Sequence, residues 1–212
     1  MDAVLPVIQK PGAVVLWNTS WTFYQQLLKE IGDQNVRVTY SNGVMEIMSP
    51  LPIHGKMKKM IGRMIELIAL ELDIPMASLG STTYSDESLD KGLEPDECYY
   101  FENELLIRGK DRIDLTIDPP PDLAVEVDIS YRAIKRESIY AAMGVPELWR
   151  FDGEHLDCLI LRDGGYEVSE WSQSLPMIRV RDLEAFIARL NTEGETSVAR
   201  SFRQWVLTLP KK

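Results

Sequence analysis

Apolar residues recur at helical spacing in several stretches of the chain. The longest stretch runs from His54 to Leu72, where apolar side chains return at steps of three and four, which predicts a long helix with one buried face. Its methionines are expected in the core, since methionine fills irregular interiors. A shorter helix is predicted at Trp21–Ile31, begun by Thr19 or Ser20 and ended by Gly32. Further helices are expected at 132–143, 183–190 and 198–207.

Strand-like runs lie between these helices. Val36–Tyr40 and Val44–Met48 flank Asn42-Gly43, a dipeptide typical of a two-residue hairpin turn. Other strands are expected at 76–83, 97–101, 123–129 and 147–151, and a hairpin at 156–161 with 166–171. Strands and helices alternate in the middle of the chain, which predicts a mixed α/β arrangement of layers. Residues 1–17 show no clear pattern and are expected to form a loose arm.

The composition is that of a globular protein. The 212 residues suit one domain, taken here as 1–212 with the arm at 1–17 and a C-terminal helical appendage at 172–212. No apolar run is long enough for a membrane span, and the N-terminus lacks a basic region followed by a long apolar core. Cys98 and Cys158 lie far apart and are expected as buried thiols in a reducing cytoplasm, where this protein is therefore placed.

The formal net charge of -10 changes the range of expected partners. Nucleic-acid contacts usually need a basic surface that neutralises phosphates. The charge leaves room for a local basic patch, but it favours small or transient contacts, or a substrate other than nucleic acid.

Two carboxylates carry the chemistry that the residues themselves indicate. Asp96 enters a predicted strand directly after a proline, and Glu126 lies in the apolar run Leu123–Val127. A carboxylate in an apolar strand is costly to bury unless it is paired, hydrogen-bonded or bound to metal. Two of them on adjacent strands would suit Mg²⁺. The alternative stays open that Asp96 caps a turn and Glu126 pairs with an arginine on a solvated face.

Longer motifs bear on the choice between a metal site and structural carboxylates. They are Gly80–Thr83, Gly92–Tyr100, Pro120–Ser130 and Ile139–Asp152, with Met48-Ser49-Pro50 and His54 upstream. In this order, over about residues 21–171, they resemble the Uma-type restriction endonuclease family of the PD-(D/E)XK nuclease superfamily. The resemblance implies an α/β (α+β) fold with a restriction-endonuclease-like core, in which helices flank a central mixed β-sheet.

The resemblance also implies roles for individual residues. Asp96 and Glu126 would bind the metal, Mg²⁺ or Mn²⁺, with help from the carbonyl of Val127. The superfamily's lysine two positions after the glutamate is Asp128 here. In the Uma-type branch a different basic residue takes the role of this lysine. It lies four positions before the tyrosine of the Tyr140-Ala141-Ala142 run, and it is Arg136 here.

Two further residues belong to the expected site. Lys135 lies beside Arg136 as a second basic candidate, and His54 is expected near the site, although a helix-terminal histidine satisfied by the backbone is an equal alternative. An arginine is a poor proton acceptor, so Arg136 can stabilise charge but is not expected to act as a base.

The function that follows is metal-dependent hydrolysis of phosphodiester bonds in nucleic acid, with DNA as the expected partner. Two alternatives stay open. One is a catalytically weakened nucleic-acid- or protein-binding module of the same fold, and the other is a hydrolase of a different phosphodiester. A homodimer is compatible with the sequence, and no membrane partner is expected.

Overall fold

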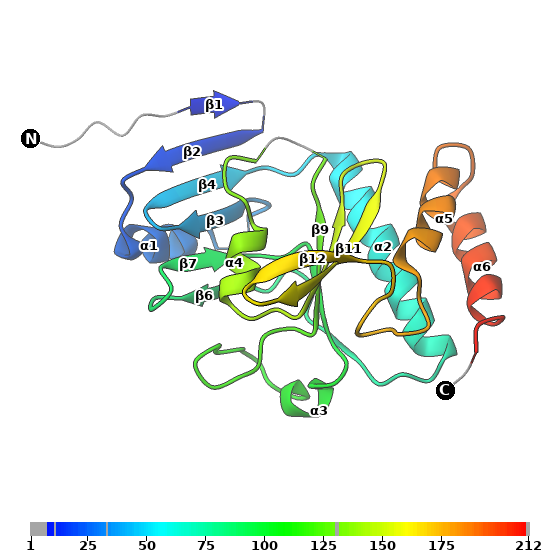
Figure 1. Ribbon diagram of the computed structural model, residues 1–212. Helices are drawn as coiled ribbons and strands as arrows, with labels where there is room; N and C mark the ends of the chain where they lie inside the picture. Colours follow the sequence, from blue (N-terminus) through cyan, green and yellow to red (C-terminus); the bar gives the residue numbers. More distant parts are fainter. Residues whose placement is uncertain (1–7, 11, 33, 130–131, 211–212) are drawn as a thin grey trace, which may run out of the picture.

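Two sheets with helices against them form the structure, a computed structural model that describes residues 8–10, 12–32, 34–129 and 132–210 (Figure 1). The first sheet has the strand order β1-β2-β4-β3-β7-β6 and the second has the order β12-β11-β10-β9-β8-β5. Strands of the first sheet are β1 (Ile8–Lys10), β2 (Ala13–Trp17), β3 (Arg37–Ser41), β4 (Val44–Met48), β6 (Tyr84–Asp86) and β7 (Lys91–Leu93). Strands of the second sheet are β5 (Ala77–Ser78), β8 (Glu97–Tyr100), β9 (Leu123–Val127), β10 (Glu147–Phe151), β11 (Leu156–Arg162) and β12 (Gly165–Ser169).

The first sheet is antiparallel and packs against α1 (Trp21–Ile31). Ser20 caps this helix, since its hydroxyl accepts the backbone N–H of Phe23 at 3.1 Å. The predicted hairpin turn is confirmed: Asn42 and Gly43 have φ angles of 48° and 79°, the left-handed conformation that a type I′ turn requires. Helix α1 and the β3–β4 hairpin could therefore be predicted from the local sequence.

The second sheet is mixed. Its neighbouring strands are antiparallel except β9 and β10, which run parallel and are joined through the short helix α4 (Glu137–Ala142). Along β9, Val125 and Val127 belong to the core formed with α2 (Pro52–Glu71), whereas Ala124 packs with Ile139 and Tyr140 of α4. Successive side chains of a strand point to opposite faces, so Glu126 lies on the α4 face.

The α2 face carries the larger core. Met57, Met60 and Met64 are buried against the sheet, which confirms the apolar stripe predicted for this helix. Helices α5 (Glu184–Arg189) and α6 (Glu195–Val206), preceded by the 3-10 turn η1 (Val180–Leu183), extend the same core beyond α2 (Figure 1). The C-terminal segment thus packs on the sheet-covering helix. The mixed sheet flanked by helices confirms the restriction-endonuclease-like fold expected from the sequence.

Three local predictions were wrong. Residues 13–17 of the expected loose arm form β2, which pairs along its length with β4, a partner that local patterns do not reveal. The strand expected at 76–83 is reduced to β5, because the chain turns at Gly80, whose φ is +57°. The helix expected from residue 132 begins only at Glu137. The preceding segment is held in another path by contacts of Arg132 with Asp128 and of the Ala133 N–H with Glu46. Residues 1–7 and 11 of the arm, and Ser130 of the family-like motif, lie outside the described residues.

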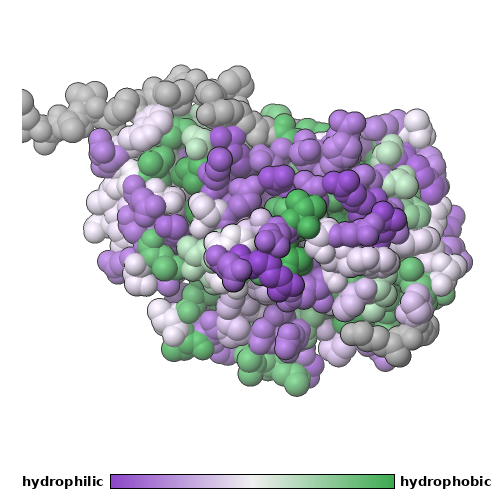
Figure 2. Space-filling model, viewed as in Figure 1, coloured by the Kyte–Doolittle hydropathy of each residue, from purple (hydrophilic) through white to green (hydrophobic). Residues whose placement is uncertain are grey.

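The remaining features are a short helix, the two cysteines and the character of the surface. The short helix α3 (Glu104–Ile107) lies in the long connection from β8 to β9. Cys98 and Cys158 are buried free thiols, as expected. Among the helices of the described part, none is both long and apolar enough to cross a membrane. The face seen in Figure 2 is mostly hydrophilic and broken by smaller apolar patches.

Candidate active site

The two expected carboxylates meet where β8 and β9 pair. Glu97, the first residue of β8, lies opposite Val125, and the backbone N–H of Asp96 donates to the Val125 carbonyl at 3.1 Å. Continued by one residue, this register sets Asp96 opposite Glu126. Residues opposite each other on antiparallel strands point to the same face. The strand pairing thus brings both side chains to the α4 face of the sheet.

Asp96 is completely buried. Its Oδ2 accepts the backbone N–H of Val127 at 2.8 Å and lies 3.0 Å from Nε2 of His54, a buried residue at the start of α2. Its Oδ1 is buried and has no hydrogen-bond partner. Burial raises the pKa of Asp96, but the contact with His54, the charge of Arg136 and the Val127 N–H outweigh it, so the pKa lies below its ordinary value. Asp96 is therefore a charged carboxylate with one unused oxygen.

Glu126 is surrounded by donors. Arg136 Nη1 donates to its Oε2 at 2.7 Å, and the Tyr140 hydroxyl donates to its Oε1. Burial raises the pKa of Glu126 to about 7, against the opposing charge of Arg136, and the nearby Asp96 adds to the rise. A buried carboxylate of this kind needs its cation. The alternative that Glu126 pairs with an arginine was correct about the partner, but the pair is buried rather than on a solvated face.

Arg136 joins the two halves of the site. Besides Glu126 it donates through Nη2 to the backbone carbonyl of Glu94, in the segment that leads to Asp96. Burial lowers its pKa, but the charges of Glu126 and neighbouring groups outweigh this and raise the pKa above the ordinary arginine value. Arg136 therefore stays charged at any working pH and can act as a fixed positive group. It lies just before α4 and not within a helix.

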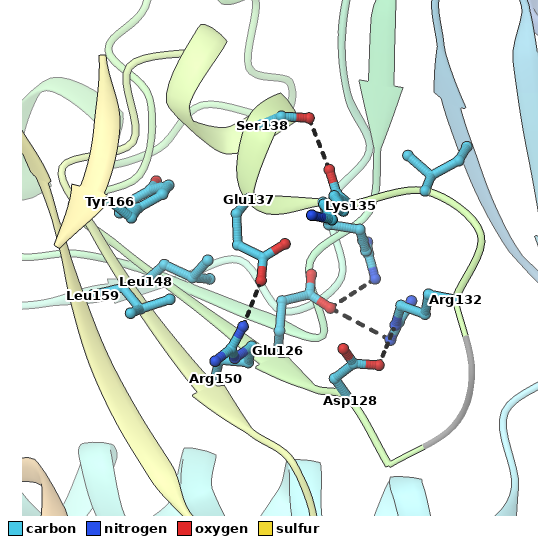
Figure 3. A pocket seen from close by; sticks show the side chains of 12 residues that line it. Glu126, Asp128, Arg132, Lys135, Glu137, Ser138, Leu148, Arg150, Leu159 and Tyr166 are labelled. Atoms are coloured by element: carbon cyan, nitrogen blue, oxygen red, sulfur yellow. Dashed lines mark hydrogen bonds and ion pairs between the residues drawn. The ribbon is translucent and has the colours of Figure 1, made fainter. Parts of the chain in front are cut away.

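Arg132 is a site residue that the sequence did not indicate. Its Nη2 lies 3.3 Å from the Val127 carbonyl oxygen and 3.5 Å from Oε2 of Glu126, while its Nε lies 3.1 Å from Oδ1 of Asp128 (Figure 3). The four-residue spacing from Asp128 to Arg132 was the only available signal. Arg132 thus contacts two of the groups expected as metal ligands.

Glu46 and Tyr140 also contact the residues of the site. Glu46 of β4 is buried and accepts the backbone N–H of Ala133, so it ties the 132–136 segment to the first sheet. Tyr140 is buried with its ring in the core, and its hydroxyl contacts Glu126. Together with the Asp128–Arg132 pair, these contacts hold the segment before α4 in a non-helical path.

A pocket of about 540 Å³ opens beside Glu126. Its lining comes from the 132–138 segment and from strands β9 to β12, and it consists of Glu126, Asp128, Arg132, Ile134, Lys135, Arg136, Glu137, Ser138, Leu148, Arg150, Leu159 and Tyr166 (Figure 3). Lys135 is exposed at this pocket, whereas Asp96 and His54 lie outside its lining. The structure therefore forms two side-chain pairs, Asp96–His54 and Glu126–Arg136, which backbone groups connect, and it sets Lys135 at the rim of the pocket.

The donor set suits a hard divalent cation. Asp96 has a buried oxygen with no hydrogen-bond partner, and the Glu126 carboxylate and the Val127 carbonyl belong to the adjacent strand. Within the described residues, no group of three or more His, Cys, Asp or Glu is arranged around one metal position. Mg²⁺ does not require one, because it is usually bound through one or two carboxylates, with waters and substrate phosphates completing its shell.

Comparison with known proteins identifies the family of this chain. A search of the curated proteins finds no match. The family model Uma2, described as "Putative restriction endonuclease", matches residues 21–192. This range contains the whole second sheet, the first sheet apart from β1 and β2, and every residue of the site. Since the match covers most of the chain, the protein belongs to the Uma2 restriction endonuclease family.

Proposed function

We propose that this protein is a metal-dependent endonuclease that hydrolyses phosphodiester bonds of nucleic acid, with DNA as its principal substrate. One observation carries the proposal: a buried, charged Asp96 with an unused oxygen lies directly before β8, opposite Glu126 of the Glu126–Arg136 pair, and an open pocket lies on the Glu126 side. A carboxylate with a purely structural role would be expected to have partners for both oxygens, because a buried oxygen without a hydrogen bond destabilises the fold. Membership of a restriction endonuclease family supports the same conclusion.

In this proposal Asp96, Glu126 and the Val127 carbonyl hold Mg²⁺ or Mn²⁺. When bound, the ion supplies Lewis-acid polarisation of a phosphate oxygen and lowers the pKa of a coordinated water. Nε2 of His54 lies 3.0 Å from Oδ2 of Asp96, so the two groups flank one oxygen of the carboxylate and Oδ1 is left for the ion. Arg136 supplies a fixed positive charge beside the position of the phosphate.

The missing superfamily lysine limits how the proton is handled. Asp128 occupies that position and pairs with Arg132. Neither arginine can accept a proton at a working pH. Arg136 and Arg132 would therefore contribute positive charge to the site and would not take the proton of an attacking water. Lys135 at the pocket rim provides a second, exposed positive charge.

One observation favours a weakened binding module as the second candidate. Both oxygens of Glu126 already have donors, Arg136 on one and Tyr140 on the other. A carboxylate satisfied in this way is a poorer metal ligand. In that case the protein would bind nucleic acid or a protein partner without cutting.

A cleavage assay separates the candidates. Single-stranded, double-stranded and structured DNA and RNA are incubated with Mg²⁺, Mn²⁺ or EDTA, and with the Asp96→Asn variant as the matched control. Metal-dependent cleavage of DNA that is lost in Asp96→Asn supports the proposal. Binding without cleavage of any substrate supports the module. Hydrolysis of a small model diester, with no cleavage of nucleic acid, would point to a different phosphodiester substrate.

A further inference from the structure

The pocket beside Glu126 has two chemically different sides. Leu148 of β10, Leu159 of β11 and Tyr166 of β12 line one side, and Glu126, Arg132 and Lys135 lie on the other (Figure 3). The Tyr166 hydroxyl donates to the Val145 carbonyl at 2.7 Å, which fixes the position of the ring. The pocket therefore offers an apolar, partly aromatic wall within reach of the proposed cleavage site.

The polar groups between these sides are matched in pairs. Arg150 donates to Glu137 at 2.7 Å and to Asp157 at 3.1 Å. The Glu137–Arg150 pair crosses the pocket between the apolar wall and Glu126 (Figure 3).

Lys135 differs from the other cations of the pocket. Arg132, Arg136 and Arg150 each pair with a carboxylate. Lys135 is exposed, and among the residues that the structure describes its ammonium has no ion-pair partner. It is therefore the positive charge most available to a phosphate.

The size of the pocket and the charge of the chain limit the substrate. A cavity of about 540 Å³ has the size of a small-molecule site and can take one nucleotide, but not a duplex. A net charge of -10 also argues against the broad phosphate contacts through which proteins hold duplex DNA. A base can enter such a pocket only after it leaves its stack, which costs least in a single strand.

We propose that this pocket binds one unpaired nucleotide, so that the protein prefers single-stranded or frayed nucleic acid over intact duplex. The base lies against Leu148, Leu159 and Tyr166, and its phosphate faces Lys135. This inference rests on the proposed function, since it assigns the substrate of the same site.

Binding measurements test the inference separately from cleavage. Fluorescence anisotropy in EDTA compares a labelled single strand with the same strand in a blunt duplex. The single strand should bind about tenfold more tightly. Tyr166→Leu should weaken single-strand binding by roughly tenfold, the usual scale for loss of one stacking contact. Tyr166→Phe keeps the ring but loses the hydroxyl bond to Val145, so it should weaken binding less than Tyr166→Leu does, and the difference between the two variants measures the contribution of the ring.

A second pair of variants tests the phosphate contact. Lys135→Ala should weaken single-strand binding several-fold, whereas Lys29→Ala, which removes the same charge from an exposed position of α1, should not. Equal affinity for strand and duplex would overturn the inference, and so would Tyr166→Leu and Lys135→Ala variants that bind like their controls. Cleavage without strand preference overturns only this inference. Strand-selective binding without cleavage retains it and overturns the nuclease proposal.

Discussion

Nη2 of Arg132 lies 3.3 Å from the carbonyl oxygen of Val127 and only slightly farther, 3.5 Å, from Oε2 of Glu126. These two oxygens are the ligands that we propose on β9. A guanidinium at this distance supplies positive charge to the same acceptors that a divalent cation would use. Arg132 and the metal therefore oppose each other, through charge repulsion and through competition for the same lone pairs.

Loss of this arginine should tighten metal binding. Arg132→Ala is expected to raise the affinity for Mn²⁺ about tenfold, which corresponds to roughly 1.4 kcal/mol. Isothermal titration calorimetry without nucleic acid measures it directly. Arg181→Ala serves as the control. It removes the same charge from an exposed side chain, whose partner is Asp157. Unchanged or weaker Mn²⁺ binding in Arg132→Ala would show that Arg132 supports the site instead of opposing the metal.

The elements with strong local signals were predictable from the sequence. The Asn42-Gly43 turn, the Ser20 cap and the periodic stripe of α2 each depend on residues close in the chain. Strand β2 was missed because its stability comes from pairing with β4, about 30 residues away. Two short strands, β6 and β7, escaped for the same reason: each takes its register from a neighbour in the sheet.

Only part of the candidate site could be predicted in the same way. Asp96 and Glu126 stood out because a family-like motif surrounds each of them, and Arg136 stood out because it lies four positions before Tyr140 of another such motif. Arg132 and Glu46 had no motif, and their roles depend on where the 132–136 segment passes. The sequence showed helical periodicity there, so the expected helix hid the contacts that make the segment irregular. Tyr140 looked like a core residue because its ring is one, and only its hydroxyl reaches Glu126.

Two glycines of α2 should respond oppositely to the same change. A Cβ at Gly62 would lie 2.9 Å from the hydroxyl of Tyr99, a fully buried residue, so Gly62→Ala should destabilise the fold by about 1–2 kcal/mol despite the better helix propensity of alanine. A Cβ at Gly55 meets nothing within 4 Å, so Gly55→Ala should stabilise by about 0.5–1 kcal/mol. Urea unfolding of both variants checks the pair, and equal shifts of the same sign would contradict the packing described here.

Substitutions in the Glu126–Arg136 pair should change stability and activity differently. Glu126→Gln leaves a buried arginine without its charge partner, and loss of one partner of such a pair costs about 3 kcal/mol or more. Replacing both residues, as Glu126→Gln with Arg136→Met, should restore much of that stability because no uncompensated charge stays buried. Activity should be absent from both variants. The measurements are urea unfolding and metal-dependent cleavage.

Asp96→Asn provides the comparison for this pair. Its amide oxygen can still accept the Val127 N–H, and its own substitution leaves the Glu126–Arg136 pair intact. It should therefore lose metal-dependent cleavage with a smaller loss of stability than Glu126→Gln. Cleavage that survives in either single variant would place the active site elsewhere in the molecule.

Arg136 and Lys135 should contribute unequally to turnover. Arg136 is buried against Glu126 and the Glu94 carbonyl, so its charge is fixed beside the proposed phosphate position. Arg136→Ala should lower the single-turnover rate by about 10²–10³-fold, the scale for losing one group that stabilises transition-state charge. Arg136→Lys should lose less, because it keeps the charge but not the two-pronged geometry. Lys135 is exposed at the rim, so Lys135→Ala should affect substrate affinity more than rate. A large loss of rate in Lys135→Ala, with none in Arg136→Ala, would mean that the exposed lysine and not the buried arginine replaces the missing superfamily lysine.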